Sequence, residues 1–380
     1  MKVLILHDTS NYAGTESHIM TLATGLSNID GVEVELLVPD ASELHQRCVV
    51  NTICHHVSSP SFIAFFLRTF YVVRKYRPQV LHTHNGRTTI IAVLVSKLLT
   101  CKVVATQHFL EPAHVTNSGI IGRLKRIVHQ WVGKQLDYRI CVSQATLRSM
   151  EQRGDIIAKT SDQVRVIYSG IKLRDSIHDT SDLCKVAILS ELRLPFDTQL
   201  ILTAARLERE KSVDVFVRAV ASICLKKPSV HAVIAGDGAE AARLHSLSES
   251  LGVSHQIHFL GFRADVDRLM LAADLFVLSS SIESFGMVLL EAMVSRTPVI
   301  APAGGGPMEI VINGESGLLY SPGDTGDLTA AIKEFLDKPD LRVAMAEVAC
   351  SRAINMFSVP KMARETFTVY SASVAGTSNE

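Results

Sequence analysis

Short runs of apolar and β-branched residues alternate along the chain with longer stretches of helical periodicity. In the first half, these runs predict strands at residues 3–7, 34–38, 80–82, 102–106, 138–142 and 164–168. In the second half, they predict strands at residues 200–204, 230–235, 257–260, 275–278, 298–301 and 317–320. Buried strands that alternate with helices are typical of parallel sheets covered by helices on both faces. The pattern therefore predicts an α/β protein with two doubly wound domains.

The alternation weakens between residues 171 and 195, where Asp and Ser are frequent and a proline ends the segment. Such a segment is typical of a connection between domains. We expect an N-terminal domain of residues 1–175 and a C-terminal domain of residues 185–357. A C-terminal helix at 358–373 is expected to pack back on the first domain. Two domains suit a chain of 380 residues, because single cores rarely grow beyond about 250 residues.

Composition narrows the class of protein. Hydrophobic residues make up 47% of the chain and charged residues 20%, which is typical of a globular protein. The seven cysteines form no CxxC pair, so neither a disulfide framework nor a zinc site is indicated, and a reducing cytoplasm is favoured. The apolar runs at the N-terminus and at residues 88–100 are too short for a signal peptide or a membrane span. No nucleic-acid partner is expected.

Charge is divided unevenly although the formal net charge is zero. Residues 1–175 hold 20 Lys and Arg against 13 Asp and Glu, and the remainder holds 18 against 25. A basic half favours an anionic partner, such as a membrane surface or a phosphate group, although charge drift without function explains it equally well. Segments 65–78 and 122–135 combine basic residues with an apolar face, and the second carries Trp131. Both are typical of helices that lie on anionic membranes, although burial in the core also explains the Phe and Val residues of the first segment.

The segment HDTSNYAGTES follows the first predicted strand and precedes a helix at residues 18–26. Gly14 would let backbone N–H groups at the start of this helix approach an anionic ligand. An ordinary turn between a strand and a helix explains the same residues.

Two short motifs have competing interpretations. Gly236, Gly238 and Ala241 match the G-x-G-x-x-A fingerprint of NAD-binding domains, but they follow the second predicted strand of their domain, and no acidic residue ends the next strand. Asp265 and Asp267 match a metal-binding D-x-D element, but capping of a helix by Asp265 is the simpler interpretation.

Histidines gather near the ends of two predicted strands. His82 and His84 lie two residues apart on one strand, and His108 follows the next strand. Imidazoles at one sheet edge can bind a metal ion or hydrogen-bond a substrate. Because no carboxylate has matching spacing, we assign no metal ligands and expect a substrate contact.

Cations and carboxylates follow the strands of the second half. Arg206 lies just after one predicted strand and Lys211 just before a helix, a geometry that suits a diphosphate without a metal ion. Glu283 lies in a loop after the strand at 275–278, and Glu291 is expected about two turns into the following helix. Because the neighbours of Glu291 are apolar, its carboxylate needs donors such as sugar hydroxyls.

In this order, these segments resemble the retaining glycosyltransferases of GT-B fold, of the group 1 or GT4 type. The matching segments are AGTE, VLHTH, TQH, VIYSGI, ARLEREKSVD, VIAGDG, FLGF, ESFGMVLLE and PVIAPAGGGPMEIVINGESGLL. Glu283 and Glu291 reproduce the E-x7-E spacing of the family. Ala13 stands where the family more often has Gly, and Ser169 where it commonly has Asn; both are mild departures.

The resemblance implies two Rossmann-like domains that face each other across a cleft, with the acceptor on the first and a nucleotide-sugar donor on the second. It implies that Arg206 and Lys211 hold the diphosphate, that Glu291 binds the ribose and that Glu283 addresses the donor sugar. Further donor contacts are expected from Gly14, Gly236, Phe262, Arg263, Ser284, Phe285 and Gly286. The residues expected to act in catalysis are Glu283, His108, Arg206 and Lys211.

The expected activity is transfer of a sugar with retention of configuration and without a metal ion. The expected donor is a UDP-sugar, or a GDP-sugar, and the expected acceptor is a saccharide or a lipid-linked molecule. The product is expected to belong to cell-surface polysaccharide or glycoconjugate synthesis. No cofactor is expected, because the nucleotide sugar is a substrate. The expected location is the cytoplasm, at the inner face of the membrane if segment 122–135 binds it. An NAD-dependent oxidoreductase and a non-catalytic sugar-nucleotide-binding protein are the alternatives.

Overall fold

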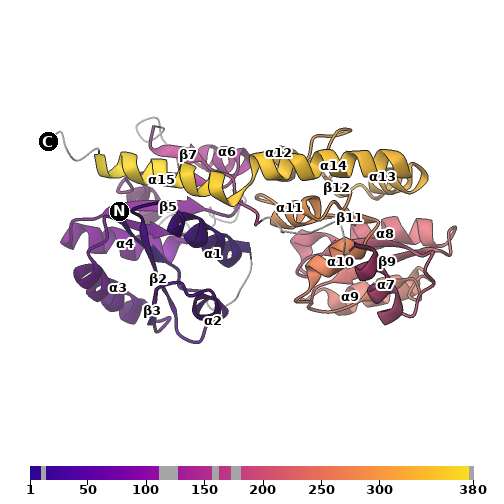
Figure 1. Cartoon of the computed structure of the whole chain (residues 1–380), viewed down its shortest axis with the longest axis horizontal. Helices are drawn as coiled ribbons and strands as arrows, with labels where there is room; N and C mark the ends of the chain where they lie inside the picture. Colours follow the sequence, from indigo (N-terminus) through magenta and orange to yellow (C-terminus); the bar gives the residue numbers. More distant parts are fainter. Residues whose placement is uncertain (10–13, 111–126, 156–161, 173–180, 376–380) are drawn as a thin grey trace. The chain divides into compact units, whose positions relative to one another are not determined.

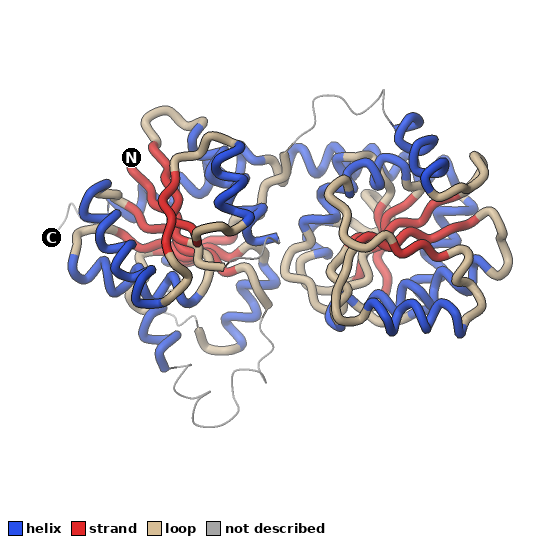
Figure 2. Tube along the Cα trace, turned by 90° about the horizontal axis from the view of Figure 1, so that it is seen from below, coloured by secondary structure: helices blue, strands red, loops and turns tan. Residues whose placement is uncertain are grey.

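The chain folds into two compact units. The computed structural model describes residues 1–9, 14–110, 127–155, 162–172 and 181–375 (Figure 1). The first unit comprises Met1–Lys172 and Phe357–Glu380, and the second comprises Leu173–Met356. In each unit the strands lie in the middle and helices cover both sides (Figure 2). Each unit is therefore a three-layered α/β fold.

The sheet of the first unit has seven parallel strands in the order β3-β2-β1-β4-β5-β6-β7. The strands are β1 (Lys2–Leu6), β2 (Glu33–Pro39), β3 (His55–Ser58), β4 (Val80–Thr83), β5 (Lys102–Gln107), β6 (Tyr138–Cys141) and β7 (Val164–Val166). The chain winds outward from β1 to β2 and β3, and then crosses back to β4. The switch point, where ligands of doubly wound sheets bind, therefore lies between β1 and β4.

Helices cover this sheet with two separate apolar cores. They are α1 (Gly14–Ser27), α2 (Glu43–Val50), α3 (Phe62–Tyr76), α4 (Gly86–Leu98), α6 (Gln144–Gln152) and α15 (Val359–Ala375). Successive side chains of a strand point to opposite faces. Val3 and Ile5 of β1 accordingly join the core under α1 and α15, while Leu4 and Leu6 join the core under α3 and α4. The C-terminal helix α15 packs against α1 and belongs to the first unit.

The sheet of the second unit has six parallel strands in the order β10-β9-β8-β11-β12-β13. They are β8 (Gln199–Ala204), β9 (Val230–Ala235), β10 (Ile257–Phe259), β11 (Leu275–Val277), β12 (Val299–Pro302) and β13 (Leu318–Tyr320). Here the switch point lies between β8 and β11.

Around this sheet lie the helices of the second unit. They are α7 (Ser181–Glu191), the 3₁₀ turn η2 (Arg209–Lys211), α8 (Val213–Cys224), α9 (Ala241–Ser250), α10 (Val266–Ala272), α11 (Met287–Val294), α12 (Pro307–Ile310), α13 (Thr325–Asp337) and α14 (Pro339–Met356). Phe216 of α8 and Phe335 of α13 are fully buried in one continuous core with β8, β9, β11 and β12.

The twelve strands expected from the apolar pattern are present, and the fold class is confirmed. One strand was missed, and one expectation is wrong. The edge strand β3 was not predicted, because its sequence HHVS lacks an apolar run. The interpretation of residues 171–195 as a connection between domains is wrong for the second half of that segment. Residues 181–191 form α7, which packs on α10 and buries Ile188 and Leu189.

The lengths and hydropathies of the described helices bear on whether one of them could cross a membrane. None of its helices combines the length and apolar character needed to cross a bilayer. All seven cysteines lie in the described residues, and none forms a disulfide.

Candidate functional site

The loops after β8 and β11 form the carboxyl edge of the sheet at the switch point of the second unit. The two strands are hydrogen-bonded neighbours, so their following loops lie side by side. The first loop carries Arg206 and η2, and the second carries Glu283. The Oγ of Ser279 donates to the carbonyl of Lys211 at 2.8 Å, and the N–H of Ser281 donates to the carbonyl of Glu210 at 2.9 Å. These bonds tie the two loops together.

A salt bridge joins the tied loops. The Nζ of Lys211 lies 2.8 Å from the Oε2 of Glu283, and the two side chains are 19% and 16% exposed. The hydroxyl of Ser280 donates to the same carboxylate oxygen at 3.2 Å. The structure thus brings together two residues that lie 72 positions apart and that sequence reasoning treated separately. Partial burial strengthens their attraction and leaves both accessible to a ligand.

Arg206 lies beside this pair in the sequence but is held only weakly. Its Nη2 is 3.5 Å from the Oε1 of Glu210, and its side chain is 64% exposed. An exposed pair of this length contributes little to stability. The guanidinium is therefore free to turn toward an anionic ligand.

The turn between Glu283 and α11 depends on close backbone packing. Gly286 has φ 102°, a conformation that favours glycine, and Phe285 is buried. A Cβ at Gly306 would lie 2.4 Å from both the Cα of Phe285 and the carbonyl oxygen of Ser284. The N–H of Gly306 donates to the carbonyl of Glu283 at 3.0 Å. The glycine-rich turn before α12 therefore sets the path of the loop that carries Glu283.

Glu291 is the fifth residue of α11, slightly more than one turn into the helix rather than the two turns expected. It is half-buried between buried neighbours such as Leu290 and Ala292. Burial, and secondarily the negative charge of Asp267, raises its pKa to about 7. Among the described residues its carboxylate has no hydrogen-bond partner. A carboxylate in apolar surroundings is suited to bind a ligand that brings its own hydrogen-bond donors.

Local backbone packing explains why positions 236 and 238 are glycine. Both adopt positive φ angles, 144° and 157°. A Cβ at Gly236 would lie 1.8 Å from the carbonyl oxygen of Ala205, and one at Gly238 would lie 2.5 Å from that of Leu207. The loop after β9 packs directly on the loop after β8, which explains both glycines without a dinucleotide.

The segment after β10 presents an aromatic ring beside a fixed cation. Phe262 is 78% exposed. The Nε of Arg263 lies 2.7 Å from the Oδ1 of Asp265, and Arg263 also pairs with Glu191 of α7. The hydrogen bond from Arg263 lowers the pKa of Asp265 despite partial burial. Asp265 occupies the N-cap position of α10 but makes no capping hydrogen bond, so the expected side-chain cap is wrong and the carboxylate instead positions Arg263.

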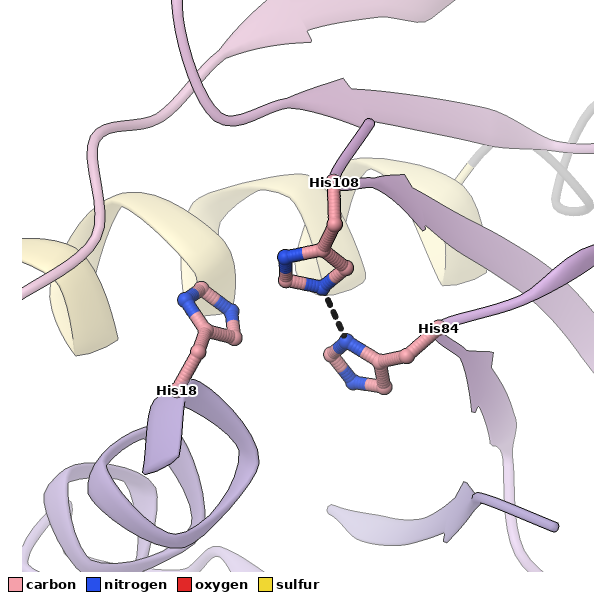
Figure 3. Close-up of side chains that lie close together, drawn as sticks. All are labelled: His18, His84 and His108. Carbon is pink, nitrogen blue, oxygen red and sulfur yellow. Dashed lines mark hydrogen bonds between the residues drawn. The ribbon is translucent and has the colours of Figure 1, made fainter. Parts of the chain in front are cut away.

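Histidines cluster in the first unit, at the carboxyl ends of β4 and β5 (Figure 3). The Nδ1 of His84 lies 2.9 Å from the Nε2 of His108. His82 lies deeper, where its two nitrogens contact the hydroxyls of Tyr370 at 2.5 Å and Thr106 at 2.7 Å. The sequence suggested a group of His82, His84 and His108. In the structure, the group is His18, His84 and His108, because His18 of α1 takes the place of His82. A lone histidine on a helix gave no signal in the sequence.

Polar residues also meet at the switch point of the first unit. The Nδ2 of Asn85 donates to the Oδ1 of Asp8 at 2.8 Å, and the Nε of Arg87 lies 3.0 Å from the Oδ2 of the same residue. A Cβ at Gly14 would meet no described atom within 4 Å. Sequence reasoning missed Asp8 and Asn85, because their pairing depends on β1 and β4 being neighbours.

Comparison with known proteins decides the family. Residues 12–175 match the family described as Glycosyltransferase Family 4, and residues 187–352 match Glycosyl transferases group 1. A D-inositol 3-phosphate glycosyltransferase of Corynebacterium jeikeium is 32% identical over 289 residues, which cover 72% of this chain and 68% of that protein. The chain is a group 1 glycosyltransferase.

Other similar proteins cover nearly the whole length of this glycosyltransferase. An uncharacterized glycosyltransferase of Methanocaldococcus jannaschii is 27% identical over 374 residues, 94% of both chains. The crystal structure of Anabaena Alr3699/HepE in complex with UDP has a TM-score of 0.85 at 22% identity and covers 98% of this chain and 100% of its own. The same protein has also been crystallised with UDP-glucose. The structural likeness confirms the GT-B fold class.

The segment expected to touch a membrane is described only in part. Residues 122–126, including Arg123, Lys125 and Arg126, lie outside the described residues. Residues 127–133 are helical, and Ile127 and Trp131 are exposed. On α3, Ile63, Leu67 and Tyr71 are also exposed, at the four-residue spacing of one helix face.

Proposed function

We propose that this glycosyltransferase moves a sugar from a UDP-sugar to a saccharide or lipid-linked acceptor, with retention of configuration and without a divalent metal ion. The observation that carries the proposal is the Lys211–Glu283 pair at the switch point of the second unit. A fixed cation beside an accessible carboxylate offers one group for a phosphate and one for a sugar hydroxyl. The UDP bound to the Anabaena protein supports the choice of nucleotide.

Each end of the donor has a matching group. Arg206 and Lys211 hold the diphosphate, and the N-terminal end of α11 adds the favourable end of a helix dipole. Glu283, with the backbone of Ser284, Phe285 and Gly286, binds the sugar. Glu291 accepts hydrogen bonds from the ribose hydroxyls, which satisfy its otherwise unpaired carboxylate.

The base binds next to the segment after β10. The exposed ring of Phe262 and the backbone at Arg263 lie at the carboxyl end of that strand. Aromatic rings left in water at such an edge offer a stacking surface for a heterocycle. Gly236 lies in the neighbouring loop, which packs directly on the loop after β8, and we propose that its backbone contacts the donor.

The chemical step balances without a cofactor. The bond between the anomeric carbon and the diphosphate oxygen breaks, and a bond to the acceptor oxygen forms on the same face. The leaving diphosphate takes the proton of the acceptor hydroxyl. Negative charge grows on the diphosphate in the transition state, and the preplaced charges of Lys211 and Arg206 stabilise it there. His108 hydrogen-bonds the donor sugar or the acceptor.

The acceptor is part of cell-surface polysaccharide or glycoconjugate synthesis in this proposal, and the enzyme works at the cytoplasmic face of an anionic membrane. The exposed apolar residues of 127–133 and the basic residues of segment 122–135 support this location. Membrane attachment would bring the enzyme to a lipid-linked acceptor.

A direct test separates this function from its alternatives. Thermal unfolding is followed with UDP, GDP and NADH, and product configuration is read from the proton coupling of the anomeric centre by NMR. The proposal predicts stabilisation by UDP and a product with the anomeric configuration of the donor. Stabilisation by NADH alone, or an inverted product, contradicts it.

A further inference from the structure

Three histidines from separate elements of the first unit converge on one buried space (Figure 3). His18 comes from α1, His84 follows β4, and His108 follows β5. One ring nitrogen of each lies within 4.8 Å of the corresponding nitrogens of the other two. All three belong to one compact unit, so their arrangement does not depend on the second unit.

Hydrogen bonds within the protein already connect two of the three rings. The Nδ1 of His18 lies 2.9 Å from the hydroxyl of Ser169, and His84 and His108 contact each other at 2.9 Å. The Nε2 of His84 is buried and has no hydrogen-bond partner in the described part of the chain. This nitrogen is not the one that faces His108, because the contact between the two rings joins the Nδ1 of His84 to the Nε2 of His108. The site between the rings therefore depends on the convergence of the three histidines and not on the unpaired Nε2.

The same burial keeps the three rings in the form that binds metal. It lowers the pKa of His18 to about 4, and with the neighbouring imidazoles it holds the pKa values of His84 and His108 well below 6.5. All three are therefore neutral at physiological pH, with a lone pair on one nitrogen of each. One of the two nitrogens in the contact between His84 and His108 carries the hydrogen-bonding proton, so that ring must move its proton to its other nitrogen when an ion binds both rings.

The spacing is close to that of a metal site. Two histidine nitrogens that bind one tetrahedral zinc ion at ~2.0–2.1 Å lie about 3.4 Å apart. The nitrogens of His84 and His108, 2.9 Å apart, need to separate by about 0.5 Å, and His18 needs to approach by up to about 1.4 Å to complete the set. Ser169 fixes the Nδ1 of His18, which leaves its Nε2 for the ion, as hydrogen-bonded partners do for many metal-binding histidines.

We propose that His18, His84 and His108 bind one divalent transition-metal ion, of which Zn²⁺ is the best match. Three imidazoles leave a fourth position for water or an anionic ligand. His82 is not a ligand, because Tyr370 and Thr106 occupy its two nitrogens.

Metal binding is tested on the full chain, stripped with a chelator and without any nucleotide sugar. Titration with Co²⁺ is expected to give the visible absorption of a tetrahedral or five-coordinate ion at one ion per chain, and Zn²⁺ is expected to displace it. In the variants His18→Phe and His84→Phe, which keep the ring volume, we expect Zn²⁺ affinity to fall at least about 100-fold.

The second unit provides a matched control. The Nδ1 of His231 lies 3.0 Å from the Nε2 of His258, nearly the spacing of His84 and His108, but no third ligand joins them in the described residues. His231→Phe is therefore expected to leave stoichiometry and affinity unchanged. A loss of Co²⁺ absorption in His231→Phe but not in His18→Phe overturns the proposal.

A structural readout covers the case in which a variant does not fold. Crystals of the wild-type chain grown with Zn²⁺ are expected to show anomalous scattering between the three imidazoles. Anomalous peaks only elsewhere, or no Co²⁺ absorption from the wild-type chain, contradict the site.

A bound ion is also expected to regulate sugar transfer. This consequence rests on the proposed function. An ion held by His108 prevents that ring from contacting sugar, so Zn²⁺ is expected to inhibit sugar transfer. Binding is measured without donor, so a chain that binds Zn²⁺ but transfers no sugar upholds the site and refutes only the activity.

Discussion

The ammonium of Lys211 lies 2.8 Å from the carboxylate of Glu283, across two loops that follow neighbouring strands. Backbone and serine hydrogen bonds hold these loops together before any ligand binds. A charge fixed in advance does not need to be reorganised when the leaving group departs, which is why such groups lower activation barriers effectively.

Removing the cation tests the importance of this pair. Because preplaced charges of this kind typically contribute about 2.7–4 kcal/mol, Lys211→Ala is expected to lower kcat/KM by roughly 10²–10³. Steady-state release of nucleoside diphosphate measures the change. Lys227→Ala is the matched control, since its pair with Asp337 is exposed and Lys227 precedes β9, at the end of the strands opposite to Lys211. Near-normal activity of Lys211→Ala would refute the assigned role.

Glu291 links stability to pH. Its pKa in the folded chain is about 7, above the ordinary value of 4.5, so folding favours the protonated form. The stability that the protonated Glu291 gives the folded chain is fully present below about pH 4.5. It is lost as pH rises toward 7, so the free energy of unfolding falls over this range. Glu291→Gln is therefore expected to be more stable than the wild type at pH 8, by up to about 3 kcal/mol, and equal to it near pH 4.5. Denaturant unfolding at both pH values measures the difference, and an effect independent of pH contradicts the explanation.

The same substitution is expected to weaken UDP binding at pH 8, because a carboxylate offers one charged acceptor oxygen to each ribose hydroxyl, whereas the amide of Gln has a single, neutral acceptor oxygen. Affinity of the wild type should then fall as pH drops below about 7, while that of Glu291→Gln stays flat. Calorimetric titration with UDP measures both. Glu315→Gln, on an exposed loop, serves as the control.

Arg206 is predicted to recognise the second phosphate. A charge-assisted hydrogen bond contributes about 1.5–3 kcal/mol, so the wild type is expected to bind UDP at least about tenfold more tightly than UMP. Arg206→Ala should lose most of that preference, whereas Arg209→Ala, whose side chain is almost fully exposed, should keep it. Equal discrimination in wild type and Arg206→Ala would remove Arg206 from the site.

Membrane attachment is predicted to depend on basic charge and on Trp131. Sedimentation with liposomes that contain anionic lipid should fall when Arg123, Lys125 and Arg126 are changed to Ser, because each basic residue near the surface contributes about 1 kcal/mol. Trp131→Ser should act in the same direction, since its ring is exposed. A wild-type chain that does not sediment with such liposomes rules out the attachment.

The strands were predictable from the sequence because parallel strands, buried on both faces, appear as continuous apolar runs. β3 was not, since His55 and His56 on an edge strand break that pattern. The resemblance identified Lys211 and Glu283 singly, but their salt bridge depends on β8 and β11 being neighbours, which no local pattern encodes. His18 joins its cluster for a similar reason, because the packing of α1 places it beside loops from distant parts of the chain.

The most direct test of the proposed activity is release of nucleoside diphosphate from a panel of UDP- and GDP-sugars, with EDTA present throughout. We expect the wild-type chain to release UDP from at least one UDP-sugar in EDTA, and Lys211→Ala to release almost none. Absence of release from every sugar nucleotide, or release that requires an added divalent metal ion, would contradict the mechanism.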